Sequence, residues 1–161
     1  MRGVAAAARE RGLAMHMDGA RLLNASAASG VPAKDFVQLC DTTWIDLSKG
    51  LGCPVGAVLV GSKDAIHEAW HWKHQFGGSM RQAGIIAAAG VYALTHHVDR
   101  LADDHENARR LARGLAQIEG IELDPPEIAT NMVFFDCEGL GISNTDMNQR
   151  LLEHGVRIGA G

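Results

Sequence analysis

The feature that most limits how this chain can fold is Lys49, which follows a short β-branched and aromatic stretch, residues 42–47, and precedes two closely spaced glycines. Such a stretch favours a strand, and glycines let the backbone approach a bound group closely. A second short strand, residues 13–18, ends in the same way on Asp18. Helical patterns alternate with these strands, so the sequence predicts an α/β layered fold.

The remaining elements follow from apolar spacing and from the residues that begin and end helices. The segments 42–47 and 55–60 are predicted to pair as a hairpin around the Lys49 loop. Residues 33–40 are predicted as a turn or short helix. A last predicted strand begins only a few residues before the sequence stops, and for this reason we expect a truncated chain. Other helices are expected at 4–11, 19–29, 62–76, 80–96, 98–118 and 144–154 (Asn144 or Thr145 as the cap), and other strands at 131–135 and 155–158.

Composition excludes several classes of function. The chain has 161 residues and a formal charge of −4, without a basic run or an interleaved aromatic stripe, so we expect no nucleic-acid partner. Its longest apolar stretches are strand-length, which predicts no membrane span. The three cysteines, Cys40, Cys53 and Cys137, are widely spaced and odd in number. That pattern indicates a reducing compartment, and we expect a cytoplasmic protein.

Two clusters have more than one interpretation. His67, His71 and His74 share helical spacing, but no carboxylate or cysteine joins them at ligand spacing, so we predict no metal site. The glycines at 77–79 precede a predicted helix. They could bind an anion through backbone N–H groups, or simply interrupt the helix.

Lys49 and Asp18 together predict a particular chemistry. Ligands of open α/β sheets bind outside the carboxyl ends of the strands, where both residues are expected. A lysine that forms a Schiff base and an aspartate that keeps a pyridine nitrogen protonated are what pyridoxal phosphate requires. Taken singly, Lys49 could be a surface lysine and Asp18 a helix N-cap. Arg21 could be a solvated helix residue.

Three segments, residues 16–22, 48–56 and 77–84, resemble the low-specificity L-threonine aldolase family in sequence and order. The resemblance extends over essentially the whole chain. It implies the fold type I architecture of pyridoxal phosphate enzymes, similar to aspartate aminotransferase. Residues 1–98 would be the C-terminal part of the large cofactor-binding domain. Residues 99–161 would be a connecting helix and the start of a smaller α+β C-terminal domain.

The resemblance also implies roles for individual residues. Lys49 would be the catalytic lysine that forms the Schiff base. Asp18 would be the partner of the pyridinium nitrogen, and Arg21 would lie near the phenolic oxygen of the cofactor. Arg81 would reach an active site, its own or that of a neighbouring subunit, and His74 would contact the cofactor phosphate in a position where the family usually has lysine.

The implied reaction is cleavage of L-threonine or L-allo-threonine to glycine and acetaldehyde, with a small β-hydroxy amino acid as substrate. A homo-oligomer, a dimer or tetramer with shared sites, is implied as well. Two alternatives stay open: another fold type I lyase that catalyses β-elimination, and an inactive fragment that needs a partner half. The family's phosphate loop and ring-stacking histidine would precede residue 1, and Arg157 does not occupy the position of the substrate-binding arginine.

Overall fold

The structure is a computed structural model that describes residues 1–159. It forms two compact units, Met1–Ala102 and Asp103–Gly161. The predicted domains, 1–98 and 99–161, stay a prediction. Among the described residues, no helix combines the length and apolar character needed to cross a membrane.

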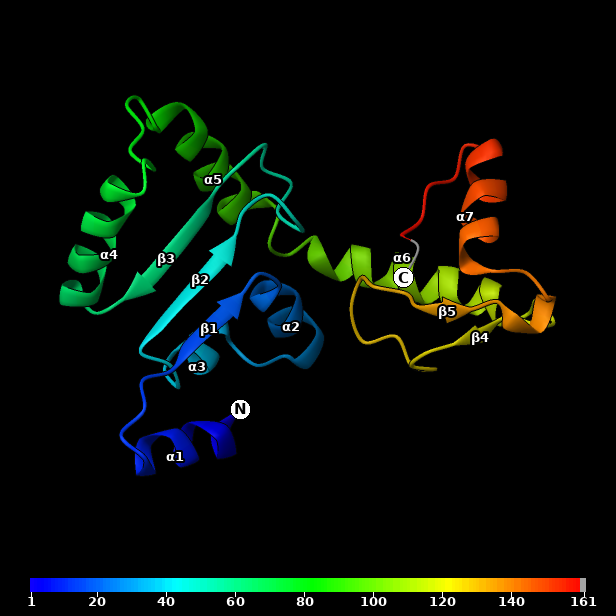
Figure 1. The fold of residues 1–161 in the computed structure, drawn as a ribbon, viewed down its shortest axis with the longest axis horizontal. Helices are drawn as coiled ribbons and strands as arrows, with labels where there is room; N and C mark the ends of the chain where they lie inside the picture. The colour runs from blue at the N-terminus through cyan, green and yellow to red at the C-terminus, as the bar shows by residue number, and fades with distance from the viewer. Residues whose placement is uncertain (160–161) are drawn as a thin grey trace. The chain divides into compact units, whose positions relative to one another are not determined.

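The N-terminal unit is built on a three-stranded sheet with the order β1-β2-β3 (Figure 1). Strand β1 (His16–Gly19) runs parallel to β2 (Thr42–Asp46), and β2 runs antiparallel to β3 (Ala57–Gly61). The predicted hairpin around the Lys49 loop is therefore confirmed. The helices of this unit are α1 (Arg2–Glu10), α2 (Leu22–Ser29), α3 (Ala33–Val37), α4 (Lys63–Gln75) and α5 (Gly84–His96).

Local signals account for most of the helix ends. The Ser62 hydroxyl accepts the Ala65 N–H at 3.2 Å and caps α4, as expected from the sequence. Helix α4 ends before Gly77, whose φ of +75° suits glycine. Helix α5 begins at Gly84 rather than at residue 80, because Gln82 has a φ of 51° that a continuing helix does not allow.

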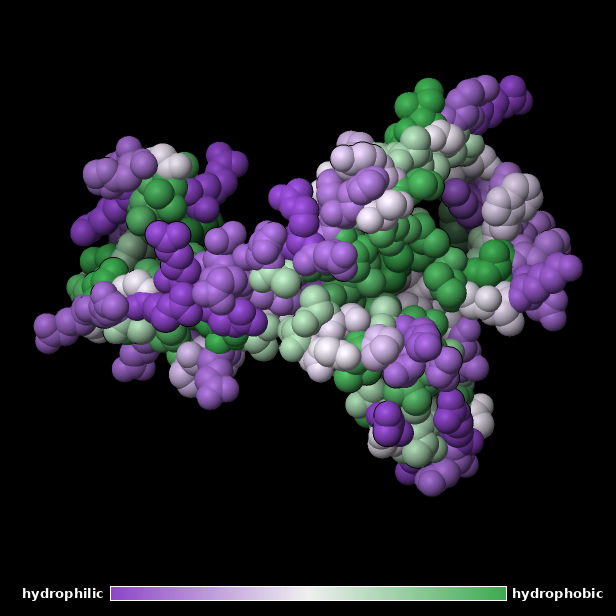
Figure 2. All heavy atoms as spheres, turned by 180° about the vertical axis from the view of Figure 1, so that it is seen from behind, coloured by the Kyte–Doolittle hydropathy of each residue, from purple (hydrophilic) through white to green (hydrophobic). Residues whose placement is uncertain are grey.

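A small apolar core supports the segment that follows β2. Leu47, Leu51, Cys53 and Ala93 are its buried members. A Cβ on Gly90 would lie 2.9 Å from Leu47 Cδ1, so a larger residue at this position would require the Leu47 side chain to shift. Other apolar side chains are exposed, and Figure 2 shows them gathered over β3 and α5. They include Val58, Leu59, Val60, Ile85, Val91 and Tyr92.

The C-terminal unit contains most of α6 (Leu101–Leu115), the antiparallel pair β4 (Glu122–Leu123) and β5 (Phe135–Asp136), the 3₁₀ turn η1 (Glu138–Leu140), and α7 (Asn144–Glu153). The predicted strand 131–135 is wrong except for its last residue, and β4 was not predicted. A strand needs a neighbour for its backbone hydrogen bonds, and here only Leu123 and Glu122 provide one.

Two further expectations for this unit are wrong. The N-cap of α7 is neither Asn144 nor Thr145 but Ser143, whose hydroxyl accepts the Asp146 N–H at 3.1 Å. Residues 155–158 do not form a strand. Sequence composition alone favoured a strand there, but no described segment pairs with it.

Candidate active site

Asp18 and Lys49 lie on the same face of the sheet. Asp18 on β1 is the register partner of Trp44 on β2, and side chains of paired residues project to one face. Lys49 Nζ lies 5.7 Å from the centroid of the Trp44 ring. Trp44 therefore lies next to both the aspartate and the lysine that the sequence singled out.

Asp18 is held by the turn that follows its strand. Its Oδ1 accepts the Ala20 N–H at 3.0 Å. The alternative that Asp18 caps the next helix is wrong, because α2 begins at Leu22 with Arg21 in the N-cap position. Within residues 1–159, the second carboxylate oxygen of Asp18 has no hydrogen-bond partner, which leaves an acceptor available.

The Lys49 loop is closed by Asp46, the last residue of β2. Asp46 Oδ1 accepts the Ser48 N–H at 2.6 Å and the Ser48 hydroxyl at 2.5 Å. Asp46 Oδ2 lies 3.4 Å from Lys49 Nζ. The two Ser48 hydrogen bonds, together with the Lys49 charge, hold the pKa of Asp46 below its usual range, so this carboxylate is ionised near neutral pH.

The turn after β1 and the Lys49 loop lie side by side. Arg21, Asn24, Asp46 and Gly50 line one small hollow. Asn24 is 3 % exposed, and a Cβ on Gly50 would lie 3.1 Å from its Oδ1. The sequence analysis missed Asn24. The only hint of Asn24 in the sequence is that it is a polar residue within the apolar part of α2.

His97 holds the far end of the same loop. Its Nδ1 lies 2.7 Å from the Leu51 carbonyl oxygen, and because a carbonyl only accepts, Nδ1 carries the proton. His97 directly follows α5, 46 residues along the chain from Leu51. No local pattern marks this contact, so sequence reasoning could not find it.

His74 and Arg81 are not brought to Lys49 in this chain. The His74 Nδ1–H donates to the Trp70 carbonyl at 2.8 Å on its own helix, and its ring packs on Trp70 at 3.8 Å between centroids. Arg81 lies in the exposed turn before α5. Within residues 1–159, neither side chain has a hydrogen bond or ion pair with Asp18 or Lys49. Their predicted cofactor roles stay predictions.

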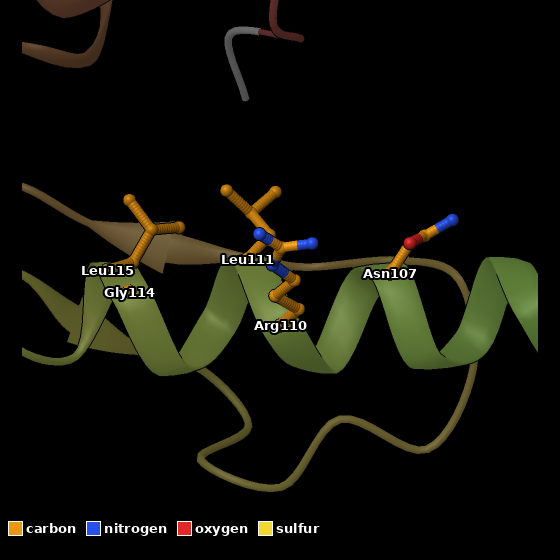
Figure 3. A pocket seen from close by; sticks show the side chains of 5 residues that line it. All are labelled: Asn107, Arg110, Leu111, Gly114 and Leu115. Carbon is orange, nitrogen blue, oxygen red and sulfur yellow. The ribbon is translucent and has the colours of Figure 1, made fainter.

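A separate hollow lies along α6 in the C-terminal unit. Figure 3 shows that all five residues lining it belong to this one helix. Arg110 is its only charged member, beside Asn107, Leu111, Gly114 and Leu115. A single arginine among apolar and amide groups provides no acid–base pair or nucleophile, so this hollow is not a catalytic candidate.

The chain matches known proteins over most of its length. It is 41 % identical over 152 residues to low-specificity L-threonine aldolase 1 of Arabidopsis thaliana, covering 94 % of this chain and 42 % of that protein. It is 50 % identical over 126 residues to the low specificity L-threonine aldolase of Escherichia coli K12, covering 78 % and 37 %. The chain thus spans about two fifths of the length of these curated relatives.

Among solved structures, a candidate L-allo-threonine aldolase from Listeria monocytogenes superposes with a TM-score of 0.84 at 25 % identity, covering 99 % of this chain and 45 % of that one. The fold is that of the pyridoxal phosphate-dependent fold type I proteins, of which the chain covers part of the large domain. The model of the beta-eliminating lyase family matches residues 1–138. The chain belongs to this family, and its resemblance to the threonine aldolases is confirmed.

Pyridoxal phosphate is the cofactor of these family members, and the residues present fit part of its binding site. Asp18 has one carboxylate oxygen available, and Lys49 is 43 % exposed on the same face of the sheet. Asp18 is paired with Trp44 across the two strands, and Lys49 Nζ lies near the Trp44 ring. A carboxylate acceptor and a reachable amine therefore lie on one face of the sheet.

Proposed function

We propose that this chain is part of a pyridoxal phosphate-dependent lyase that cleaves L-threonine or L-allo-threonine to glycine and acetaldehyde. The observation that carries the proposal is the placement of Asp18 and Lys49 on one face of the sheet, with Trp44 the register partner of Asp18 and its ring near the Lys49 amine. Aldolases among the curated relatives support the choice of reaction. The activity is proposed for the longer protein of which such a chain forms a part.

Each residue would contribute a distinct step. Lys49 would supply the amine that bonds to the cofactor aldehyde. Asp18 would hold a proton on the pyridine nitrogen through its available oxygen. The chemistry that bound pyridoxal phosphate supplies is delocalisation of the negative charge left on the substrate Cα. Arg21 would contact the cofactor beside the Lys49 loop, whose hollow it lines.

The first experiment is reductive trapping. The purified chain is mixed with pyridoxal phosphate, reduced with borohydride, digested and analysed by mass spectrometry. We expect selective labelling of Lys49, lost in Lys49→Ala and retained in Lys63→Ala. Labelling spread over Lys34, Lys63 and Lys73, or no labelling, would contradict the proposed site.

The β-elimination alternative is favoured by one observation, the beta-eliminating lyase family match. The two reactions differ in product. Aldol cleavage of threonine releases acetaldehyde, whereas β-elimination releases ammonia and a 2-oxo acid. Assaying both products with a loaded sample separates the reactions. Trapping at Lys49 without either product would favour the remaining alternative, a chain that requires a partner half.

We also propose a homo-oligomer, a dimer or tetramer, in which Arg81 and His74 serve a neighbouring site. Supporting this, Phe76 and Ile85, on either side of Arg81, are 83 % and 81 % exposed. Large apolar side chains in such positions often mark protein contacts. Sedimentation analysis tests this proposal, and a monomer at micromolar concentration would contradict it. A cytoplasmic location and a role in threonine breakdown and glycine formation are proposed on the same family grounds.

A further inference from the structure

The Lys49 amine is held by two side chains of β2. Its Nζ lies 3.4 Å from Asp46 Oδ2 and 5.7 Å from the centroid of the Trp44 ring. Trp44 and Asp46 are two residues apart in one strand, so their side chains project to the same face. That face is also the face of Asp18.

Asp46 is itself fixed in place. One of its oxygens accepts both Ser48 donors, so the other oxygen faces Lys49. Its side chain is 13 % exposed, and Asp46 is paired with Ala57 in the hairpin register. The same Ser48 hydrogen bonds keep the pKa of Asp46 low, which maintains the negative charge opposite Lys49.

We propose that Asp46 is a positioning residue that, with the Trp44 ring, forms a cradle for the Lys49 ammonium. The carboxylate provides an opposite charge and the ring provides a cation–π surface. The cradle keeps the amine on the sheet face that carries Asp18 and withholds it from other electrophiles until it reacts. This inference rests on the proposed role of Lys49, but its test does not require the cofactor.

The test measures how fast Lys49 is acetylated by isotopically labelled acetic anhydride at one fixed pH, without pyridoxal phosphate. In that reaction the ammonium first gives one proton to water, the neutral Nζ then bonds to the acyl carbon while the acyl–oxygen bond to acetate breaks, and the nitrogen gives a second proton to water. Asp46→Asn keeps an acceptor for Ser48 but removes the charge. We expect its Lys49 to react about twofold to fivefold faster than in the wild type, the range that a half-exposed ion pair gives. The matched control Asp64→Asn, on α4, should leave the Lys49 rate unchanged.

A second arm distinguishes a charge effect from a folding defect. Salt screens ion pairs, so about 1 M NaCl should raise the Lys49 rate of the wild type relative to that of Lys63, and should leave Asp46→Asn unchanged. Equal rates for wild type and Asp46→Asn at low salt would overturn the cradle. If Lys49 is acetylated at the expected rates but is not trapped by pyridoxal phosphate, only the proposed function would be overturned.

Discussion

Gly19 provides the sharpest test of how the strand carrying Asp18 is packed. A Cβ at this position would collide with the main-chain oxygen of Trp44 and lie 3.1 Å from Thr43 Cγ2. Thr43 has no exposed surface, and the oxygen belongs to the neighbouring strand, so neither can move away cheaply. Overpacking of this kind costs about 1–3 kcal/mol, and a lost ladder hydrogen bond adds about 1 kcal/mol.

We therefore expect Gly19→Ala to lower the free energy of unfolding by about 2–4 kcal/mol. The assay is urea unfolding followed by tryptophan fluorescence and circular dichroism. Gly84→Ala is the matched control, because nothing lies within 4 Å of its added Cβ and it begins α5. It should be neutral or slightly stabilising. A Gly19→Ala variant as stable as the wild type would refute the argument that β1 and β2 are packed this tightly.

Three further predictions concern stability. Leu47→Ala removes the centre of the core under the Lys49 loop and should cost about 2–5 kcal/mol in urea unfolding; a loss below about 1 kcal/mol would contradict the core assignment. Ser62→Ala should lower the free energy of unfolding by about 1 kcal/mol through the lost N-cap of α4, whereas Ser62→Asn should keep most of the capping stabilisation. Burial, and then the Arg109 charge, lower the pKa of His105, which is 2 % exposed, while Asp104 opposes them. Because the unfolded state then binds more protons, stability should be lost as the pH falls below about 6.5. His105→Gln should weaken that pH dependence, measured as the free energy of unfolding in urea at several pH values. Wild type and variant that lose the same free energy of unfolding between pH 7.5 and 5.5 would contradict the prediction.

Prediction from the sequence succeeded where short-range signals act. The strand before Lys49, the hairpin around it and the Ser62 cap depend on residues close in sequence, and the structure contains all three. Prediction failed at residues 131–135 and 155–158, where the composition suits a strand. Only the fold determines whether such a segment finds a partner to pair with.

For the candidate active site, too, some features follow from the sequence and others only from the tertiary structure. The chain's own order of residues determined that an aspartate would lie at the end of one short strand and that a lysine would follow another, and the family match explains that order. Only the tertiary structure decided that Asp18 and Trp44 are paired, that Asp46 faces Lys49, and that His97 holds Leu51. Strand register and contacts between distant segments arise from packing and backbone hydrogen bonding across the sheet, which a local sequence pattern does not specify.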